Sequence, residues 1–258
     1  MDYNELHLRE VFHLSLLRFL VRALPVEGFV LKGGSNLRFF FRSDRYSEDM
    51  DLDVQGVEVH VLRDKVMDAL DSDALRDAMS TYGVMEIVPP DLHHAKQTEP
   101  VQRFKIHLIT DAGVDLFTKV EFSRRGISGK ITTEGVSTER LRQYRMPPLV
   151  VPHYTAGAAL LQKLVALRDR QVPEARDVFD ANLLRTQTEA DVEGVEDEFT
   201  PEDRERVRDR ILAISFEEYR DKVLAFLHPD DRAGYDARPV WDEMRLNVID
   251  LVGNGGRG

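Results

Sequence analysis

Acidic residues alternate with apolar ones in the segment Asp49-Met50-Asp51-Leu52-Asp53. This alternation predicts a β-strand, on which residues two apart point to the same face. Carboxylates aligned in this way repel one another unless a cation neutralises them. Mg²⁺ (or Mn²⁺) binds a few carboxylates together with phosphate oxygens of a substrate. The spacing therefore predicts a divalent-metal site on the strand face that Asp49, Asp51 and Asp53 share.

A glycine-rich turn precedes these carboxylates. Gly33-Gly34-Ser35 follows a short apolar strand predicted over residues 28–32, and Ser35 is a natural N-cap for a helix predicted over residues 36–41. Glycines let the backbone approach a ligand closely, and a helix N-terminus offers free N–H groups to an anion. The turn therefore predicts a cradle for the phosphates of a nucleoside triphosphate.

A second predicted strand, over residues 114–122, carries a third acidic residue. Lys119 and Glu121 alternate there with apolar neighbours. If this strand lies beside the aspartate strand, Glu121 completes the metal cluster. Upstream, Asp111-Ala112-Gly113 is a plausible hairpin turn that joins this strand to one predicted over residues 101–110.

The elements that position these residues divide the chain near residue 150. Before it we expect a helix over residues 3–24, a helix over residues 60–81 and a β-rich stretch. After it we expect helices over residues 153–171, 174–186, 201–214, 216–227 and 239–251. The predicted organisation is an α/β domain over residues 1–150 and an all-helical domain over residues 151–258.

Composition excludes several classes of protein. The chain has no cysteine, which excludes disulfides, thiolate zinc sites and cysteine nucleophiles. No apolar run approaches the roughly 18 residues of a membrane span. Charged residues recur along the first helix, which is typical of an amphipathic helix and not of a signal peptide. We expect a cytoplasmic protein that does not enter a membrane.

The charge is unevenly distributed. The net charge is −11, yet residues 101–176 hold 13 Lys and Arg against 7 Asp and Glu. A basic middle segment fits a phosphate-bearing partner, and pairing with the acidic C-terminal part is an equal alternative.

Three arginines and a histidine pair also need an interpretation. Arg38, Arg42 and Arg45 either contact phosphates or pair with acidic residues nearby in the chain. The pair His93-His94 has no acidic or histidine partner at metal-ligand spacing and is interpreted as a loop.

Gly-Gly-Ser followed after roughly a dozen residues by an acidic pair on a strand resembles the signature of the DNA polymerase β-like nucleotidyltransferases. The closer forms LKGGSNLR and RYSEDMDLD resemble the AbiEii/AbiGii toxin branch of that superfamily. The resemblance implies an α+β fold with a mixed twisted sheet and flanking helices, and it assigns the metal-binding pair to Asp49 and Asp51. Asp53 stands where the family is often not acidic, so the resemblance ranks it third.

Two more stretches are similar to the family pattern. TKVEFSRR at residues 118–125 is similar to its lysine- and glutamate-bearing strand, which supports Lys119 as a nucleotide-binding residue and Glu121 as a metal ligand. LLQKLVALRDRQVPEARDVFD at residues 160–180 is similar to its second conserved block.

The second block implies that the helical domain completes the active-site cleft through Lys163, Arg176, Asp177 and Asp180. Lys163 would hold the triphosphate and stabilise charge on the leaving pyrophosphate. Asp177 would position that lysine or orient the nucleotide, and Arg176 would bind the nucleotide. The resemblance ends near residue 185, and the role of residues 186–258 stays open.

The resemblance implies a metal-dependent nucleotidyltransferase that moves a nucleoside monophosphate from an NTP to an acceptor hydroxyl. In this family the acceptor is often the 3′ end of tRNA, and the enzyme is the toxin of a toxin–antitoxin or phage-defence system, with an antitoxin as partner. The alternatives are a protein acceptor, a small-molecule acceptor, and a non-catalytic member that binds nucleotide or RNA or docks a partner through its acidic helical half.

Overall fold

A computed structural model of the chain describes residues 3–91, 97–98, 100–187 and 198–253. They form two compact units. Unit 1 comprises residues 1–40 and 46–154, and unit 2 comprises residues 41–45 and 155–258. The short segment Phe41–Arg45 thus belongs to unit 2, although the residues on both sides of it belong to unit 1. The predicted loop at His93-His94 lies outside the described residues.

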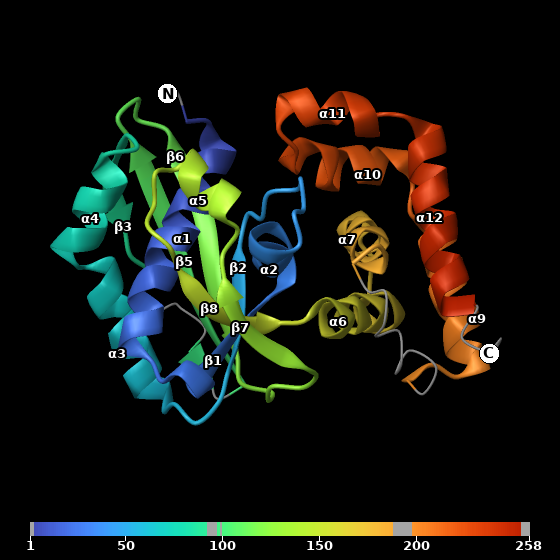
Figure 1. The fold of residues 1–258 in the computed structure, drawn as a ribbon, viewed down its shortest axis with the longest axis horizontal. Coiled ribbons are helices and arrows are strands. Elements are labelled where there is room, and N and C mark those ends of the chain that lie inside the picture. Colours follow the sequence, from blue (N-terminus) through green and yellow to red (C-terminus); the bar gives the residue numbers. More distant parts are fainter. Residues whose placement is uncertain (1–2, 92–96, 99, 188–197, 254–258) are drawn as a thin grey trace. The chain divides into compact units, whose positions relative to one another are not determined.

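Unit 1 is built around one mixed eight-stranded sheet (Figure 1). Its strand order is β3-β5-β6-β2-β1-β8-β7, and β4 pairs with β5. In the middle of the sheet, β2 pairs antiparallel with β1 and parallel with β6. The strands are β1 (Phe29–Lys32), β2 (Met50–Val54), β3 (Val84–Val88), β4 (Gln97–Thr98), β5 (Val101–Thr110), β6 (Asp115–Ser123), β7 (Ile131–Gly135) and β8 (Val150–Tyr154). The expected mixed sheet with helices is confirmed.

The apolar core of unit 1 lies between this sheet and α1, which also packs against α3 and α4 (Figure 1). Phe12 and Leu16 of α1 are fully buried, as are Phe104 and Val120 of the sheet. α2 packs against β1 and β2. The helices are α1 (Glu5–Ala23), α2 (Gly33–Phe40), α3 (Val59–Leu70), α4 (Asp73–Ser80) and α5 (Thr138–Gln143), with a 3-10 turn η1 (Val26–Gly28).

Two sequence predictions about helices need correction. The helix predicted over residues 60–81 is two helices, because Ser72 accepts a hydrogen bond from the backbone N–H of Leu75 and caps a new helix there. Ser35 is not an N-cap, because α2 already begins at Gly33. Gly33 has a φ of 69°, a conformation open to glycine, and it lets the chain pass from β1 directly into the helix.

Unit 2 contains the helices α6 (Ala156–Asp169), α7 (Ala175–Arg185), α9 (Pro201–Ala213), α10 (Phe216–Lys222), α11 (Pro229–Tyr235) and α12 (Arg238–Gly253), with a 3-10 turn η2 (Leu224–Phe226). Its core includes the fully buried Trp241, whose ring stacks on Tyr219 with 4.5 Å between the centroids. Within the described ranges, no helix combines the length and apolar character needed to cross a membrane.

A buried histidine joins α1 to the strand β6. His13 is 1% exposed, and its Nε2 lies 2.8 Å from Oγ1 of Thr118. The Thr118 hydroxyl donates to the carbonyl of Glu48 at 2.7 Å, so it accepts from the imidazole, whose Nε2 carries the proton. This chain of two hydrogen bonds fixes the backbone just before Asp49 relative to α1. Since neighbouring strand residues point to opposite faces, Lys119 lies on the face away from α1.

Burial lowers the pKa of His13 to about 3, with a smaller contribution from Arg9. In the unfolded chain the His13 imidazole has its ordinary pKa of 6.5. Below pH 6.5 the unfolded chain therefore binds a proton at His13 that the folded chain does not bind, and the free energy of unfolding decreases. We expect this group alone to lower the free energy of unfolding by about 2 kcal/mol between pH 7.5 and 5.0. Urea denaturation of the wild type and of His13→Gln at both pH values measures the difference.

His60, which is exposed on α3, provides the matched control. His60→Gln should keep the pH dependence of the wild type, whereas His13→Gln should lose part of it. Identical pH dependence in all three proteins would contradict the assignment of the effect to His13.

Candidate active site

Asp49 stands immediately before β2 and is held by three groups of unit 1. Its Oδ2 lies 2.9 Å from Nζ of Lys119. Its backbone carbonyl accepts the hydroxyls of Ser35 at 3.1 Å and Ser47 at 2.7 Å. Its Oδ1 is buried and accepts no hydrogen bond from any described residue. The side chain therefore presents one uncompensated buried oxygen, a site that suits a cation.

Ser35 is placed differently from the prediction that it cradles phosphate. It is 1% exposed, and its hydroxyl is engaged by the carbonyl of Asp49. In the structure Ser35 therefore ties the first turn of α2 to the start of β2. This contact fixes the glycine turn and the first aspartate against each other.

Asp51 lies beside this turn. A Cβ placed on Gly33 would lie 2.9 Å from Oδ2 of Asp51, closer than such atoms approach in proteins. Gly33 thus provides the space that the carboxylate occupies, in addition to its positive φ. Burial raises the pKa of Asp51; Lys119 and Lys32 oppose this, and Asp49 and Glu121 raise the pKa further. Protons or cations are therefore favoured at this carboxylate.

Glu121 is brought next to Asp51 by the parallel pairing of β2 and β6. This confirms the predicted adjacency of the two strands. Its carboxylate, however, binds Arg103 on β5, with Oε2 2.7 Å from Nε and 2.6 Å from Nη2. Sequence reasoning missed Arg103.

The residues present fit a divalent cation at the aspartate pair. The orphaned oxygen of Asp49 and the space that Gly33 leaves for Asp51 are the features that support it. Across the described residues, no group of three or more His, Asp or Glu side chains is positioned to hold a metal ion together, so the fit rests on the aspartate pair alone. Glu121, predicted as the third ligand, is occupied by Arg103.

Asp53 is part of a separate buried contact. Its Oδ1 lies 2.6 Å from Nζ of Lys32, and its Oδ2 accepts the hydroxyl of Tyr154 at 2.7 Å. It is 5% exposed. Both oxygens are therefore compensated, and Asp53 joins β2 to β1 and β8.

Arg38 is also a structural residue of unit 1. It is 2% exposed, and its Nε lies 2.6 Å from Oε1 of the buried Glu10. Its guanidinium stacks 3.7 Å above the centroid of the Tyr46 ring, and the Tyr144 hydroxyl donates to Oε2 of Glu10. This cluster fastens α2 to α1, so Arg38 is not available to phosphates.

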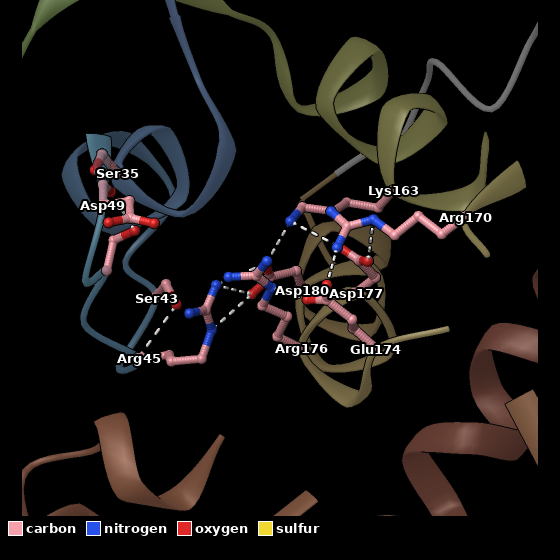
Figure 2. Close-up of polar contacts among 11 residues, drawn as sticks. Ser35, Ser43, Arg45, Asp49, Lys163, Arg170, Glu174, Arg176, Asp177 and Asp180 are labelled. Atoms are coloured by element: carbon pink, nitrogen blue, oxygen red, sulfur yellow. Dashed lines mark hydrogen bonds and ion pairs between the residues drawn. The ribbon is translucent and has the colours of Figure 1, made fainter. Parts of the chain in front are cut away.

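In unit 2, Lys163 on α6 is enclosed by two carboxylates of α7 (Figure 2). Its Nζ lies 3.1 Å from Oδ1 of Asp177 and 2.7 Å from Oδ2 of Asp180. Burial disfavours the charged ammonium, but Asp180 and Asp177 outweigh it and raise the pKa of Lys163. The lysine is thus held as a cation.

The neighbours of this lysine complete a buried network. Arg45 donates to both oxygens of Asp180, at 3.1 and 2.9 Å from Nη2 (Figure 2). Asp180 is fully buried, and although burial opposes it, Arg45 and Lys163 lower its pKa. Arg176, a predicted nucleotide-binding residue, pairs with Glu174 and keeps 43% of its side chain exposed.

The sequence was compared with known families and structures. A family model described as the nucleotidyl transferase AbiEii toxin of a type IV toxin–antitoxin system matches residues 15–245. The chain belongs to this family. Membership makes the AbiEii chain a nucleotidyltransferase, and it implies an NTP as substrate and an antitoxin as partner.

Two solved structures share the fold of this AbiEii chain. MenT4, a nucleotidyltransferase toxin from Mycobacterium tuberculosis H37Rv, is 18% identical with a TM-score of 0.64, and the match covers 97% of this chain and 84% of that one. JHP933 from Helicobacter pylori is 20% identical with a TM-score of 0.53, and the match covers 99% and 93%. The comparison with curated proteins gave no match.

Gly33→Ala should impair nucleotide transfer by the AbiEii chain at least tenfold. The new Cβ would displace the Asp51 carboxylate, and an L-residue at this φ costs roughly 1 kcal/mol of stability. Nucleotide transfer and urea denaturation of the same preparation measure the two effects separately.

Gly56→Ala is the matched control, because Gly56 has a φ of 66° and nothing lies within 4 Å of an added Cβ. It should lose a similar backbone contribution to stability and keep wild-type transfer. Equal activity of the two variants would contradict the role given to Gly33.

Proposed function

We propose that this chain transfers a nucleoside monophosphate from an NTP to the 3′ hydroxyl of tRNA, as the toxin of its toxin–antitoxin pair. The observation that carries the proposal is the aspartate pair, in which a buried oxygen of Asp49 has no hydrogen-bond partner among the described residues and Asp51 fills the space beside Gly33. Membership of a nucleotidyltransferase toxin family supports the reaction type. The polymerase β-like core that the resemblance implies is part of the same proposal.

The proposed reaction is a displacement at the α-phosphorus. The acceptor hydroxyl oxygen forms a new bond to that phosphorus and loses its proton. The bond between the α-phosphorus and the bridging oxygen breaks, and pyrophosphate leaves with the electron pair. Such a transfer depends mainly on positioning and on electrostatic stabilisation of the phosphoryl oxygens.

Asp49 and Asp51 would hold Mg²⁺ or Mn²⁺, with Glu121 as a further ligand once Arg103 leaves it. A bound divalent cation would supply charge neutralisation at the phosphates and lower the pKa of the acceptor hydroxyl. Lys119, which lies 2.9 Å from Asp49, would meet phosphate oxygens of the nucleotide. The backbone of Gly33 and Gly34 would approach the β- and γ-phosphates.

The helical unit is proposed to contribute cationic side chains to the same reaction. Lys163 would bind the triphosphate, and its fixed position between Asp177 and Asp180 suits a cation that must not reorganise. Asp177 is then a positioning residue. Arg176, with its exposed guanidinium, would bind the nucleotide.

A polyanionic acceptor agrees with the charge of the segment that supplies β5 and β6. Residues 101–176 hold 13 Lys and Arg against 7 Asp and Glu, within a chain of net charge −11. Local charge, not total charge, decides the affinity for a phosphate backbone. This favours RNA over a protein as the acceptor.

Asp49→Asn and Asp51→Asn should each reduce transfer about a hundredfold or more, because each removes a charge that holds the phosphoryl group's counter-ion. The measurement incubates purified protein, Mg²⁺, total tRNA and each α-labelled NTP in turn. Label in tRNA from one NTP, lost in both variants, is the expected result.

Asp64→Asn, at an exposed carboxylate of α3, is the control and should transfer as the wild type does. Near-full activity of Asp49→Asn would refute the assigned role. Label recovered only in protein would replace the RNA acceptor with a protein one, and NTP binding without any label would indicate a non-catalytic member.

A further inference from the structure

The sheet face that carries the aspartates continues across β6 and β5 as a cationic surface. Residues paired on adjacent strands lie side by side on one face, about 5 Å apart. Asp51 pairs with Glu121, and Glu121 pairs with Arg103. One step along the strands on the same face, Lys119 pairs with Lys105. Carboxylates therefore give way to cations within two strands.

Lys105 differs from the other cations of this face. Lys119 is bound to Asp49 and Arg103 to Glu121, whereas Lys105 is exposed and makes no hydrogen bond or ion pair with any described residue. It also stands directly opposite Lys119, an arrangement of like charges that destabilises a sheet. Lys105 thus adds no ion pair to the described part of unit 1, and its charge is accounted for if it binds an anion.

An aromatic pair comes next on the same face. Phe117 pairs with His107, and their ring centroids are 5.5 Å apart at an interplanar angle of 69°. The His107 side chain is 43% exposed, with Nδ1 2.8 Å from Oδ1 of Asp115, and Phe117 is half-buried. Rings beside an exposed lysine on a sheet face suit single-stranded nucleic acid, because bases stack on the rings while a phosphate meets the lysine.

We infer that this surface, the acceptor face (Arg103, Lys105, His107, Phe117 and Lys119), binds the single-stranded 3′ end of the acceptor RNA. The inference rests on the proposed function and states where the acceptor RNA of that reaction binds. Lys105 contacts a phosphate, and the ring of Phe117 stacks on a base. The end of the strand then lies one or two β-strands from Asp49 and Asp51, where its hydroxyl is needed.

An acidic peptide would also meet Lys105, but it would gain nothing from the neighbouring rings of His107 and Phe117. The terminal hydroxyl that the reaction consumes and the phosphates that Lys105 attracts both belong to an RNA end. The acceptor face adjoins the aspartate pair on the same side of the sheet. An RNA strand bound along this face would therefore reach the aspartates without contacts to another element.

The test measures binding apart from catalysis. A fluorescent single-stranded oligoribonucleotide with a free 3′ hydroxyl is titrated without NTP, at two salt concentrations, into wild type, Lys105→Glu and Phe117→Leu. Lys105→Glu should weaken binding about tenfold or more and reduce the slope of log affinity against log salt by about one. Phe117→Leu should weaken binding about tenfold with little change in that slope.

Lys65→Glu makes the same charge change at an exposed residue of α3, a helix that packs against α1, and it should bind as the wild type does. NTP affinity should be equal in all four proteins, and equal thermal denaturation shows that Phe117→Leu is folded. In the transfer reaction, Lys105→Glu should raise the KM for tRNA and leave the KM for NTP unchanged.

Wild-type affinity in both acceptor-face variants, or no oligonucleotide binding by the wild type, would overturn the inference, even if labelled tRNA confirms the proposed function. Loss of binding in both variants supports it, even if no transfer occurs and the proposed function fails. Label that reaches only a protein, with Lys105→Glu unaffected, overturns it as well.

Discussion

Repulsion among Asp49, Asp51 and Glu121 is the constraint at the centre of unit 1, because the pairing of β2 with β6 sets Glu121 beside Asp51, and Asp49 stands two residues before Asp51. The negative charge of each carboxylate is compensated by cations on neighbouring strands. Lys119 binds Asp49, Arg103 binds Glu121, and Lys119 and Lys32 together oppose the raised pKa of Asp51. The compensation is partial, since one oxygen of Asp49 stays without a partner. The cations that allow the sheet to form are thus the same ones that a phosphate-bearing substrate would use.

Two further ion pairs position the elements that carry Asp49 and Asp51. In each pair the two charges compensate each other. Glu10 with Arg38 fastens α2 to α1, and Asp53 with Lys32 fastens β2 to β1. The desolvation cost of burying such a pair nearly cancels the attraction between its charges. The pairs therefore contribute little to the free energy of unfolding and mainly fix the positions of the elements they join. The glycine turn at the start of α2 and the aspartates of β2 consequently meet in one arrangement, closed by the hydrogen bond from Ser35 to Asp49.

Local patterns were sufficient to predict the strand at Asp51, the glycine turn and the adjacency of Glu121, because periodicity and turn chemistry act over a few residues. The hairpin turn at residues 111–113 even determined that Arg103 faces Glu121, because the two are equidistant from Ala112. The partners of Arg38 and Asp53 were out of reach, since Glu10 and Tyr154 lie 28 and 101 residues away in the chain. Spacing alone placed Asp49, Asp51 and Asp53 on one face. Only the tertiary contacts with Lys32 and Tyr154 show that Asp53 is structural.

Segment Phe41–Arg45 is held by contacts inside unit 2. It lies between the glycine turn and Asp49 in the sequence, yet Arg45 binds Asp180 and pairs with Leu227 in an isolated bridge. Asp180 also binds Lys163, so one buried carboxylate holds both the loop that leads to the aspartates and the lysine of the second motif. Asp177 and Asp180, three residues apart on α7, face the same side of that helix and share this lysine. Asp180 is fully buried and bound by two cations, so within unit 2 it anchors both Arg45 and Lys163.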